Sequence, residues 1–242
     1  MFRKLFFNEK AFIMEEIING KIILIDKPLH WSSFQAVNKL KWAILKKFKL
    51  KKVKIGHTGT LDPLATGLLI ICTGKFTKKI EEIQATSKVY IGKITLGATT
   101  PSFDMETETN AIFPTAHITP QLVEQVRNQF VGEIQQYPPV FSALKKDGKR
   151  LYEFAREGKE VDIEARKVSI YDLKLDFISS NELFFEVHCS KGTYIRSLAN
   201  DIGKALQSGG YLSYLRRTKI GDFSVENALS PEDFVKKYIE IE

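Results

Sequence analysis

The chain has 242 residues, of which 43% are hydrophobic and 27% are charged. This length and composition exclude an intrinsically disordered chain and allow either one large domain or two small ones. The 36 Lys and Arg residues outnumber the 29 Asp and Glu residues and give a net charge of +7. That balance is compatible with a polyanionic partner but does not by itself require one.

The two cysteines, Cys72 and Cys189, lie far apart, and neither has a Cys or His neighbour at the spacing of a zinc site. We therefore predict no metal site and a reducing, cytoplasmic location. The longest apolar run after the N-terminus, residues 68–72, is too short to cross a membrane, so no membrane insertion is expected. Residues 1–18 are interpreted as an extension of unknown role, in which Met14 is an alternative start.

Residues 21–26 are predicted to form a buried strand, and a helix follows in which Ser32 and Gln35 form a capping box. The predicted apolar face of this helix consists of Phe34, Val37, Leu40, Ile44, Leu45 and Phe48. Eight lysines crowd the helix and its exit: Lys39, Lys41, Lys46, Lys47, Lys49, Lys51, Lys52 and Lys54. They form either a solvated face or a phosphate-contacting surface. The absence of acidic residues among them favours the second interpretation.

Residues 56–67 (GHTGTLDPLATG) are predicted to be a glycine-punctuated loop, residues 88–97 a strand, and residues 100–118 a polar connection. Thr119 and Pro120 begin a further predicted helix as N-cap and first helical residue.

Residues 171–177 and 183–189 alternate between apolar and polar side chains, a pattern typical of half-exposed strands. The second strand leads into a helical pattern from Ile195, so Arg196 lies in the first turn of a helix, where free backbone N–H groups favour anions. A last short helix begins at Ser230. Strands in runs with intervening helices indicate an α+β fold in one body.

Asp62 is the residue whose surroundings point most clearly to chemistry. Pro63 disfavours a helical conformation at Asp62, and the glycines of the loop allow a ligand to approach the backbone closely. Either Asp62 caps a turn, or its carboxylate projects into a cleft. The sequence contains neither a Ser-His-Asp signature, a phosphate-binding glycine loop nor an HExxH motif. If the protein is an enzyme, one carboxylate therefore acts as a nucleophile, and a nearby guanidinium would favour its charged form.

Several separated motifs together resemble the TruB family of tRNA pseudouridine synthases. They are Asp26-Lys27-Pro28, the loop at 56–67, Tyr90 within Ser87–Tyr90, the stretch Pro138–Lys145, Ser190–Arg196 and Leu215-Arg216-Arg217-Thr218. The resemblance covers roughly residues 19–235 and follows the family's order. It implies a pseudouridine-synthase-type catalytic domain over residues 19–242, with a mixed, mainly antiparallel sheet flanked by helices.

The resemblance also implies a reaction, the isomerisation of uridine to pseudouridine at position 55 in the T loop of tRNA. By position, Asp62 resembles the nucleophile and Arg196 the arginine that pairs with it. Tyr90 resembles the aromatic residue that stacks on the target base, Tyr194 and Leu215 resemble pocket walls, and His57 resembles the residue that meets the T loop during base flipping. Flipping costs a few kcal/mol, of which stacking on an aromatic ring returns about 1–3 kcal/mol.

Other interpretations of these residues remain open. Tyr90 and Leu215 could be core residues, Tyr194 could pack at a helix start, and His57 could be a hydrogen-bonding loop residue. His30 departs from the family, which usually has glycine there, so the turn into the lysine-rich helix is expected to differ. The chain ends soon after the last motif, and no separate C-terminal RNA-binding domain is expected.

No metal or organic cofactor is implied, and the expected partner is the T stem-loop of tRNA, with no obligate protein partner. Two other functions are alternatives: a non-catalytic tRNA-binding or folding factor, and a pseudouridine synthase for another RNA. A carboxylate facing RNA phosphates argues against the first. The sequence does not distinguish attack on ribose C1′ from attack on the uracil base.

Overall fold

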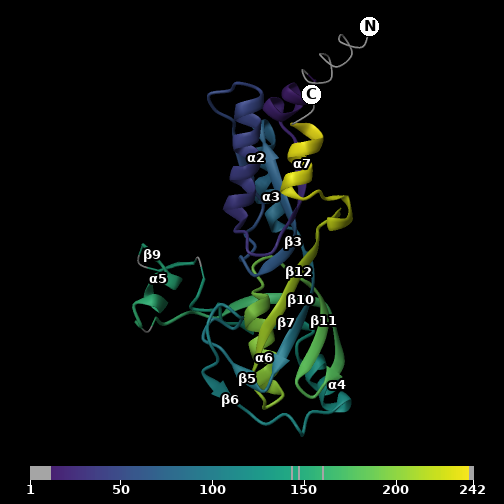
Figure 1. Ribbon diagram of the computed structural model, residues 1–242. Helices are drawn as coiled ribbons and strands as arrows, with labels where there is room; N and C mark the ends of the chain where they lie inside the picture. The colour runs from purple at the N-terminus through teal and green to yellow at the C-terminus, as the bar shows by residue number, and fades with distance from the viewer. Residues whose placement is uncertain (1–11, 143, 147, 160, 240–242) are drawn as a thin grey trace. The chain divides into compact units, whose positions relative to one another are not determined.

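The computed structural model describes residues 12–142, 144–146, 148–159 and 161–239 (Figure 1). The chain forms two compact units: unit 1 comprises Met1–Thr86 and Arg216–Glu242, and unit 2 comprises Ser87–Leu215. Strand β12 (Gly210–Ile220) passes from one unit to the other between Leu215 and Arg216.

The sheet of unit 1 has the order β1-β3-β12. Strands β1 (Ile22–Lys27) and β3 (Ala65–Thr73) are antiparallel, with Ile22 opposite Cys72 and Lys27 opposite Gly67. Two short strands extend the sheet: β2 (Ile55–His57) pairs with β3, and β13 (Phe223–Ser224) pairs with β12. Because β3 is covered on both faces, its side chains are buried almost without interruption.

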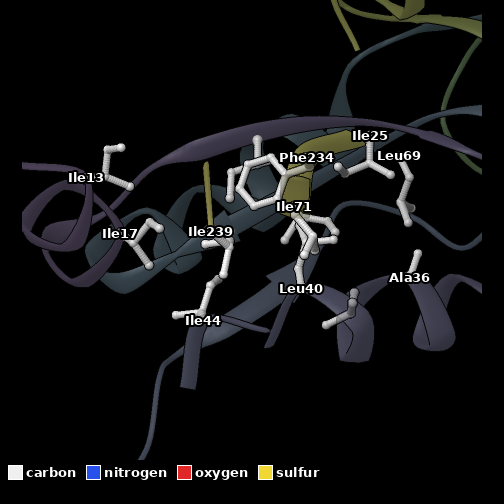
Figure 2. Packing of buried hydrophobic residues seen from close by; sticks show 13 residues of the cluster. Ile13, Ile17, Ile25, Ala36, Leu40, Ile44, Leu69, Ile71, Phe234 and Ile239 are labelled. Carbon is white, nitrogen blue, oxygen red and sulfur yellow. The ribbon is translucent and has the colours of Figure 1, made fainter. Parts of the chain in front are cut away.

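Helices cover both faces of this sheet. Residues 12–19, α2 (Ser33–Lys47) and α7 (Pro231–Tyr238) pack on one face, around Ile25, Leu69 and Ile71 (Figure 2). On the other face, η1 (Gly74–Lys79) and α3 (Ile80–Ala85) pack against Leu68, Ile70 and Cys72. A short turn, η2 (Val225–Asn227), precedes α7. Unit 1 is therefore a three-layer structure.

Helix α2 begins as predicted, since the Ser32 side chain accepts a hydrogen bond from the backbone N–H of Gln35, whose side chain accepts one from the Ser32 N–H. Its predicted apolar face was wrong at Phe34, which is 68% exposed. Ser33 and Ala36 are buried in its place. The helix is rotated toward these small residues because the Ser33 hydroxyl is used in a buried contact with the loop that contains Asp62.

The sheet of unit 2 has the order β12-β4-β11-β10-β7. Its other strands are β4 (Lys88–Leu96), β7 (Gly132–Gln136), β10 (Arg166–Ser179) and β11 (Glu182–Cys189). The pairs β4–β11, β11–β10 and β10–β7 are antiparallel. The alternation of side chains predicted for residues 183–189 is confirmed, and that predicted for residues 171–177 holds from Asp172 onward. Tyr171 is exposed like Asp172, at a register shift in the pairing of β10 with β11.

Helices α4 (Pro120–Gln129) and α6 (Ile195–Ala205) pack against the sheet of unit 2 and against each other. Thr119 caps α4 through a hydrogen bond from the backbone N–H of Leu122, as predicted. The remaining elements are small: α5 (Leu151–Arg156) and two hairpins. The hairpins are β5 (Ala98–Thr99) with β6 (Ala111–Ile112), and β8 (Lys145–Lys146) with β9 (Lys149–Arg150).

The predicted α+β fold with a mainly antiparallel sheet and flanking helices is confirmed. The loop predicted for residues 56–67 is shorter than expected, because Gly56 and His57 belong to β2 and residues 65–67 begin β3. The polar connection at 100–118 contains strand β6. Residues 1–11 of the predicted extension and Ala143 lie outside the described residues, whereas Ile13 and Ile17 belong to the core of unit 1.

Candidate functional site

The loop that carries Asp62 joins β2 to β3 in unit 1. Asp62 is half-buried, and its backbone oxygen accepts a hydrogen bond from the N–H of Ala65 over 3.0 Å, which closes a turn with Pro63 at its second position. The turn expected from the Asp-Pro pair is therefore present. Because this hydrogen bond uses the backbone, the carboxylate of Asp62 is not needed to close the turn.

Ser33, the first residue of α2, and His30, in the turn before it, hold this loop on both sides of Asp62. The Ser33 hydroxyl accepts a hydrogen bond from the N–H of Leu61 over 2.8 Å and donates one to its oxygen over 3.0 Å. On the other side, the N–H of His30 donates to the oxygen of Pro63 over 2.8 Å. Hydrogen bonds on both sides of Asp62 reduce the number of conformations that this short loop can adopt. Asp62 is thus presented from a segment held at both neighbouring residues.

His30 lies in the turn between β1 and α2. Its φ angle is +66°, in the left-handed region that glycine adopts most readily. This conformation costs a non-glycine residue roughly 1–2 kcal/mol. His30 therefore takes up a backbone conformation that is unfavourable for a residue with a side chain.

Two buried cations accompany the Asp62 loop. Lys27 is fully buried, and its ammonium group donates to the oxygens of Pro28 over 2.9 Å and Trp31 over 2.6 Å. Burial lowers the pKa of Lys27 from 10.5 to about 8, while the negative charge of Asp62 acts in the opposite direction. Arg217 is also buried, and it donates to the oxygens of Leu68 over 2.8 Å and Gly59 over 3.1 Å. Both cations raise the local positive potential around the Asp62 loop.

Gly67 marks a close approach of two backbones in this region. Its φ angle is +103°, and a Cβ atom there would lie 2.3 Å from the backbone oxygen of Arg217. Only glycine fits this position without displacing a neighbour. The approach places Arg217 beside the first residues of β3, directly after the Asp62 loop.

His57 is the last residue of β2 and is half-buried. Burial lowers its pKa, and the positive charge of Arg217 contributes in the same direction, against an opposing effect of the Gly59 backbone. The imidazole is therefore neutral at pH 7. A neutral ring can stack or exchange hydrogen bonds with RNA bases without a change of charge.

The other predicted site residues belong to unit 2. Tyr90 lies on β4 opposite Val187 of β11, and Leu215 lies on β12; both side chains are buried. Tyr194 is the N-cap residue of α6, and Arg196 follows in the first turn, as the sequence predicts. Of the predicted site residues, His57 and Asp62 thus belong to unit 1, and Tyr90, Tyr194, Arg196 and Leu215 belong to unit 2.

Gln136, at the end of β7, holds Tyr194 by its backbone. The side-chain amide of Gln136 accepts a hydrogen bond from the Tyr194 N–H over 2.7 Å and donates to the Tyr194 oxygen over 3.1 Å. The hydroxyl of Ser197 donates to the oxygen of Tyr137 over 2.7 Å. These contacts fix the start of α6 and use one of the backbone donors predicted to be available to anions.

Arg196 is 6% exposed, and the groups around it in unit 2 were not predicted. Its Nη1 atom donates to the backbone oxygen of Ser102 over 3.2 Å and lies 3.6 Å from Oδ2 of Asp104. Asp104 is itself buried, and its Oδ1 accepts a hydrogen bond from the N–H of Glu106. No sequence signal identifies Asp104, because it lies in the polar connection between β5 and β6.

Within the described ranges, no cluster of three or more His, Cys, Asp or Glu side chains is arranged to hold a metal ion. In the same part of the chain, every helix is too short or too polar to cross a membrane.

Comparisons with known proteins agree with the motifs. Residues 46–195 match the N-terminal domain of the TruB family pseudouridylate synthases, and residues 196–242 match the tRNA pseudouridylate synthase B C-terminal domain. The tRNA pseudouridine synthase B of Flavobacterium johnsoniae is 60% identical over 89% of this chain and 94% of its own length. The enzyme of the same name from Phocaeicola vulgatus is 54% identical over 89% and 92%.

Solved structures support the same fold. A chain in the crystal structure of a Cbf5–Nop10–Gar1 complex is 30% identical, with a TM-score of 0.69 over 95% of this chain. A chain of an H/ACA RNP bound to a substrate RNA containing 2′-deoxyuridine is 28% identical, with a TM-score of 0.66 over 95% of this chain. This chain spans 59% and 58% of the lengths of those two chains.

Proposed function

Because the chain belongs to the TruB family of pseudouridylate synthases, we propose that it isomerises uridine to pseudouridine at position 55 in the T loop of tRNA, with Asp62 as the nucleophile. The observation that carries the substrate class is the 60% identity over most of the chain to an enzyme named tRNA pseudouridine synthase B. The sequence motifs support the modification of position 55 of the tRNA and the role of Asp62 as nucleophile.

In the proposed reaction, the target uridine leaves its stack and its base packs on the ring of Tyr90. Asp62 attacks and forms a covalent bond, the C1′–N1 bond breaks, and the detached uracil turns so that C5 bonds to C1′; the bond to Asp62 then breaks and its carboxylate is regenerated. N1 gains a proton and C5 loses one, so the atoms and electrons balance without any oxidant. The same atoms and electrons balance whether Asp62 first attacks C1′ or the uracil base.

The surroundings of Asp62 support a nucleophilic role. A nucleophile must be ionised and held in a fixed position. Lys27 and Arg217 supply positive charge in unit 1, and Ser33 and His30 hold the residues on either side of Asp62. In unit 2, we assign Arg196 to pairing with the catalytic carboxylate, and Tyr194 and Leu215 to the walls around the base. His57 is assigned to the T loop.

The test is incubation of the protein with an unmodified tRNA transcript and with its isolated T stem-loop, followed by mapping of pseudouridine. We expect pseudouridine at position 55 in both RNAs. Modification only at other positions or in other RNAs would assign the enzyme another substrate, and tight binding without modification would indicate a tRNA-binding factor.

Asp62→Asn tests the nucleophile separately. The amide keeps the shape of the side chain, so we expect RNA binding to persist and turnover to disappear. Asp222→Asn, at an exposed aspartate of the same unit, is the matched control and should keep the wild-type rate. Single-turnover product formation by Asp62→Asn near the wild-type rate would remove Asp62 from the mechanism.

A further inference from the structure

Helix α2 presents an exposed tryptophan between two exposed lysines on its outer side. Lys39, Trp42 and Lys46 are spaced by three and four residues and therefore lie on one face of the helix. The opposite face, which includes Leu40 and Ile44, is buried in the core of unit 1 (Figure 2). We refer to Lys39, Trp42 and Lys46 as the outer stripe.

Exposure of Trp42 is the unusual feature of this stripe. Tryptophan is highly buried on average, yet Trp42 is 70% exposed. Its apolar ring would be more stable against a partner than in water, by an amount that grows with the area covered. Phe34, the other exposed aromatic residue of α2, lies eight residues away, and two separate rings do not form an apolar face that could insert into a membrane, since the apolar face of α2 is already used in the core.

The charge of the surroundings selects the kind of partner. Helix α2 contains no acidic residue, and its exit adds the exposed lysines Lys49, Lys51, Lys52 and Lys54. The acidic residues of unit 2 outnumber its basic residues by one, so unit 1 holds the whole positive excess of the chain. An aromatic ring flanked by ammonium groups matches the two recurring parts of a nucleic acid strand, a flat base and a phosphate.

The helix that carries the stripe begins close to the loop of the candidate nucleophile. Ser33, the first residue of α2, is hydrogen-bonded through its hydroxyl to the backbone of Leu61, the neighbour of Asp62. At a rise of 1.5 Å per residue, Lys39, Trp42 and Lys46 lie roughly 9, 14 and 20 Å along the helix axis from Ser33. These distances run along the helix axis only: Ser33 lies on the buried side of α2, so an RNA strand that reaches both Asp62 and the outer stripe passes around the start of the helix.

We propose that the outer stripe of α2 is a second RNA-binding surface, in which Trp42 stacks on an unpaired base while Lys39 and Lys46 bind phosphates on either side of it. The inference rests on the proposed function, since it takes the RNA that is modified at Asp62 as the ligand. The stripe contributes to affinity and not to the chemical step. It therefore changes KM and leaves kcat as it is.

Fluorescence tests the stacking directly. The chain contains two tryptophans, so Trp31→Phe leaves Trp42 as the only indole. Titration of this variant with unmodified tRNA transcript at fixed salt should quench the emission of Trp42 and saturate together with binding measured by filter retention. Saturated binding with unchanged Trp42 emission would overturn the proposal.

Kinetics provide the second test. Trp42→Ala is expected to raise KM about five- to a hundredfold, the range that one base–aromatic stack represents, with kcat unchanged. Trp42→Phe should restore most of the affinity because a smaller ring can still stack. Lys39→Gln combined with Lys46→Gln should also raise KM, whereas the matched control Lys236→Gln combined with Lys237→Gln, at exposed lysines of α7, should not.

These outcomes separate the two proposals. If the wild-type protein forms no pseudouridine in tRNA, the proposed function fails. If the wild-type protein is active and Trp42→Ala has the wild-type KM, the outer stripe does not bind the substrate. A stripe that binds an acidic protein would give this second result, with no quenching by tRNA.

Discussion

Arg196 and Asp104 form a buried ion pair in unit 2, with Nη1 of Arg196 3.6 Å from Oδ2 of Asp104. The backbone oxygen of Ser102 accepts a further hydrogen bond from the same nitrogen. Charged groups at such low exposure are costly unless they are paired. Asp104 therefore offsets the charge of Arg196 and limits the positions of its guanidinium group.

Asp104→Asn should weaken both folding and catalysis. The amide keeps the shape but leaves the charge of Arg196 less compensated, so we expect the free energy of unfolding to fall by about 1–3 kcal/mol. A less well-held Arg196 should lower kcat by roughly ten- to a hundredfold, about 1.4–2.7 kcal/mol of barrier. Urea unfolding and single-turnover assays measure the two effects. Glu106→Gln, at an exposed carboxylate two residues away, is the control, and equal rates for both variants would contradict this role.

Gln136→Glu should disturb the start of α6. The Gln136 amide is both acceptor and donor to the backbone of Tyr194, whereas a carboxylate can only accept. The Glu side chain would bring a carboxylate oxygen against the Tyr194 oxygen, and we expect a loss of about 1–3 kcal/mol in the free energy of unfolding. Gln135→Glu, at the exposed neighbouring position, should have little effect. Similar stability of the two variants in thermal unfolding would rule out the amide bridge as an important contact.

Lys27 should make the stability of unit 1 depend on pH in the alkaline range. Its pKa is lowered from 10.5 to about 8 in the folded protein, so between these values the unfolded chain binds more protons. The contribution of Lys27 to the free energy of unfolding is thus fully present above pH 10.5 and is lost as the pH falls through about 8. Over this range the free energy of unfolding changes by about 1.4 kcal/mol for each step of one in pH.

The comparison of wild type with Lys27→Met isolates this effect. The difference in free energy of unfolding, wild type minus variant, should be larger at about pH 9.5 than at about pH 7, by roughly 2 kcal/mol. Urea unfolding followed by tryptophan emission is suitable because both tryptophans lie in unit 1. A difference that is constant over this range would mean that Lys27 keeps its ordinary pKa.

The lysines at the exit of α2 should set the salt dependence of RNA binding. Replacing Lys49, Lys51, Lys52 and Lys54 with Gln is expected to weaken binding to any tRNA, because each lost phosphate contact lowers the log–log salt slope by about 0.7–0.9. Binding isotherms at several salt concentrations give the slope. Arg at the same four positions keeps the charge and should keep the slope. An unchanged slope in the Gln variant would make this segment a solvated face.

The sequence was most informative at the ends of helices. Ser32, Thr119 and Ser230 each cap the helix predicted to begin there, because a capping hydroxyl acts within four residues and leaves a local signature. Strand β3 has no such signature. Both of its faces are buried, so the alternation that marks a half-exposed strand is missing, and residues 68–72 were recognised only as an apolar run.

The site residues were predicted from sequence motifs, whereas the groups around them became visible only in the fold. Buried Arg217 bonds to backbone oxygens of Gly59 and Leu68, contacts that depend on the path of the chain and leave no local pattern. Asp104 meets Arg196 across 92 residues for the same reason. The exposure of Phe34 also required the structure, since helical spacing alone cannot tell a buried serine from an exposed phenylalanine.

The composition of unit 1 from two separate chain segments has a consequence for folding during synthesis. Its core joins Ile13 and Ile17 to Phe234, Val235 and Ile239, so it stays incomplete until the last of these residues leaves the ribosome. Unit 2 is one continuous segment, and all of it leaves the ribosome before the second segment of unit 1 does. Domains generally fold as units in the order of their synthesis. The segment that carries Arg196 can therefore acquire its structure while the segment that carries Asp62 still waits for its final strand and helix.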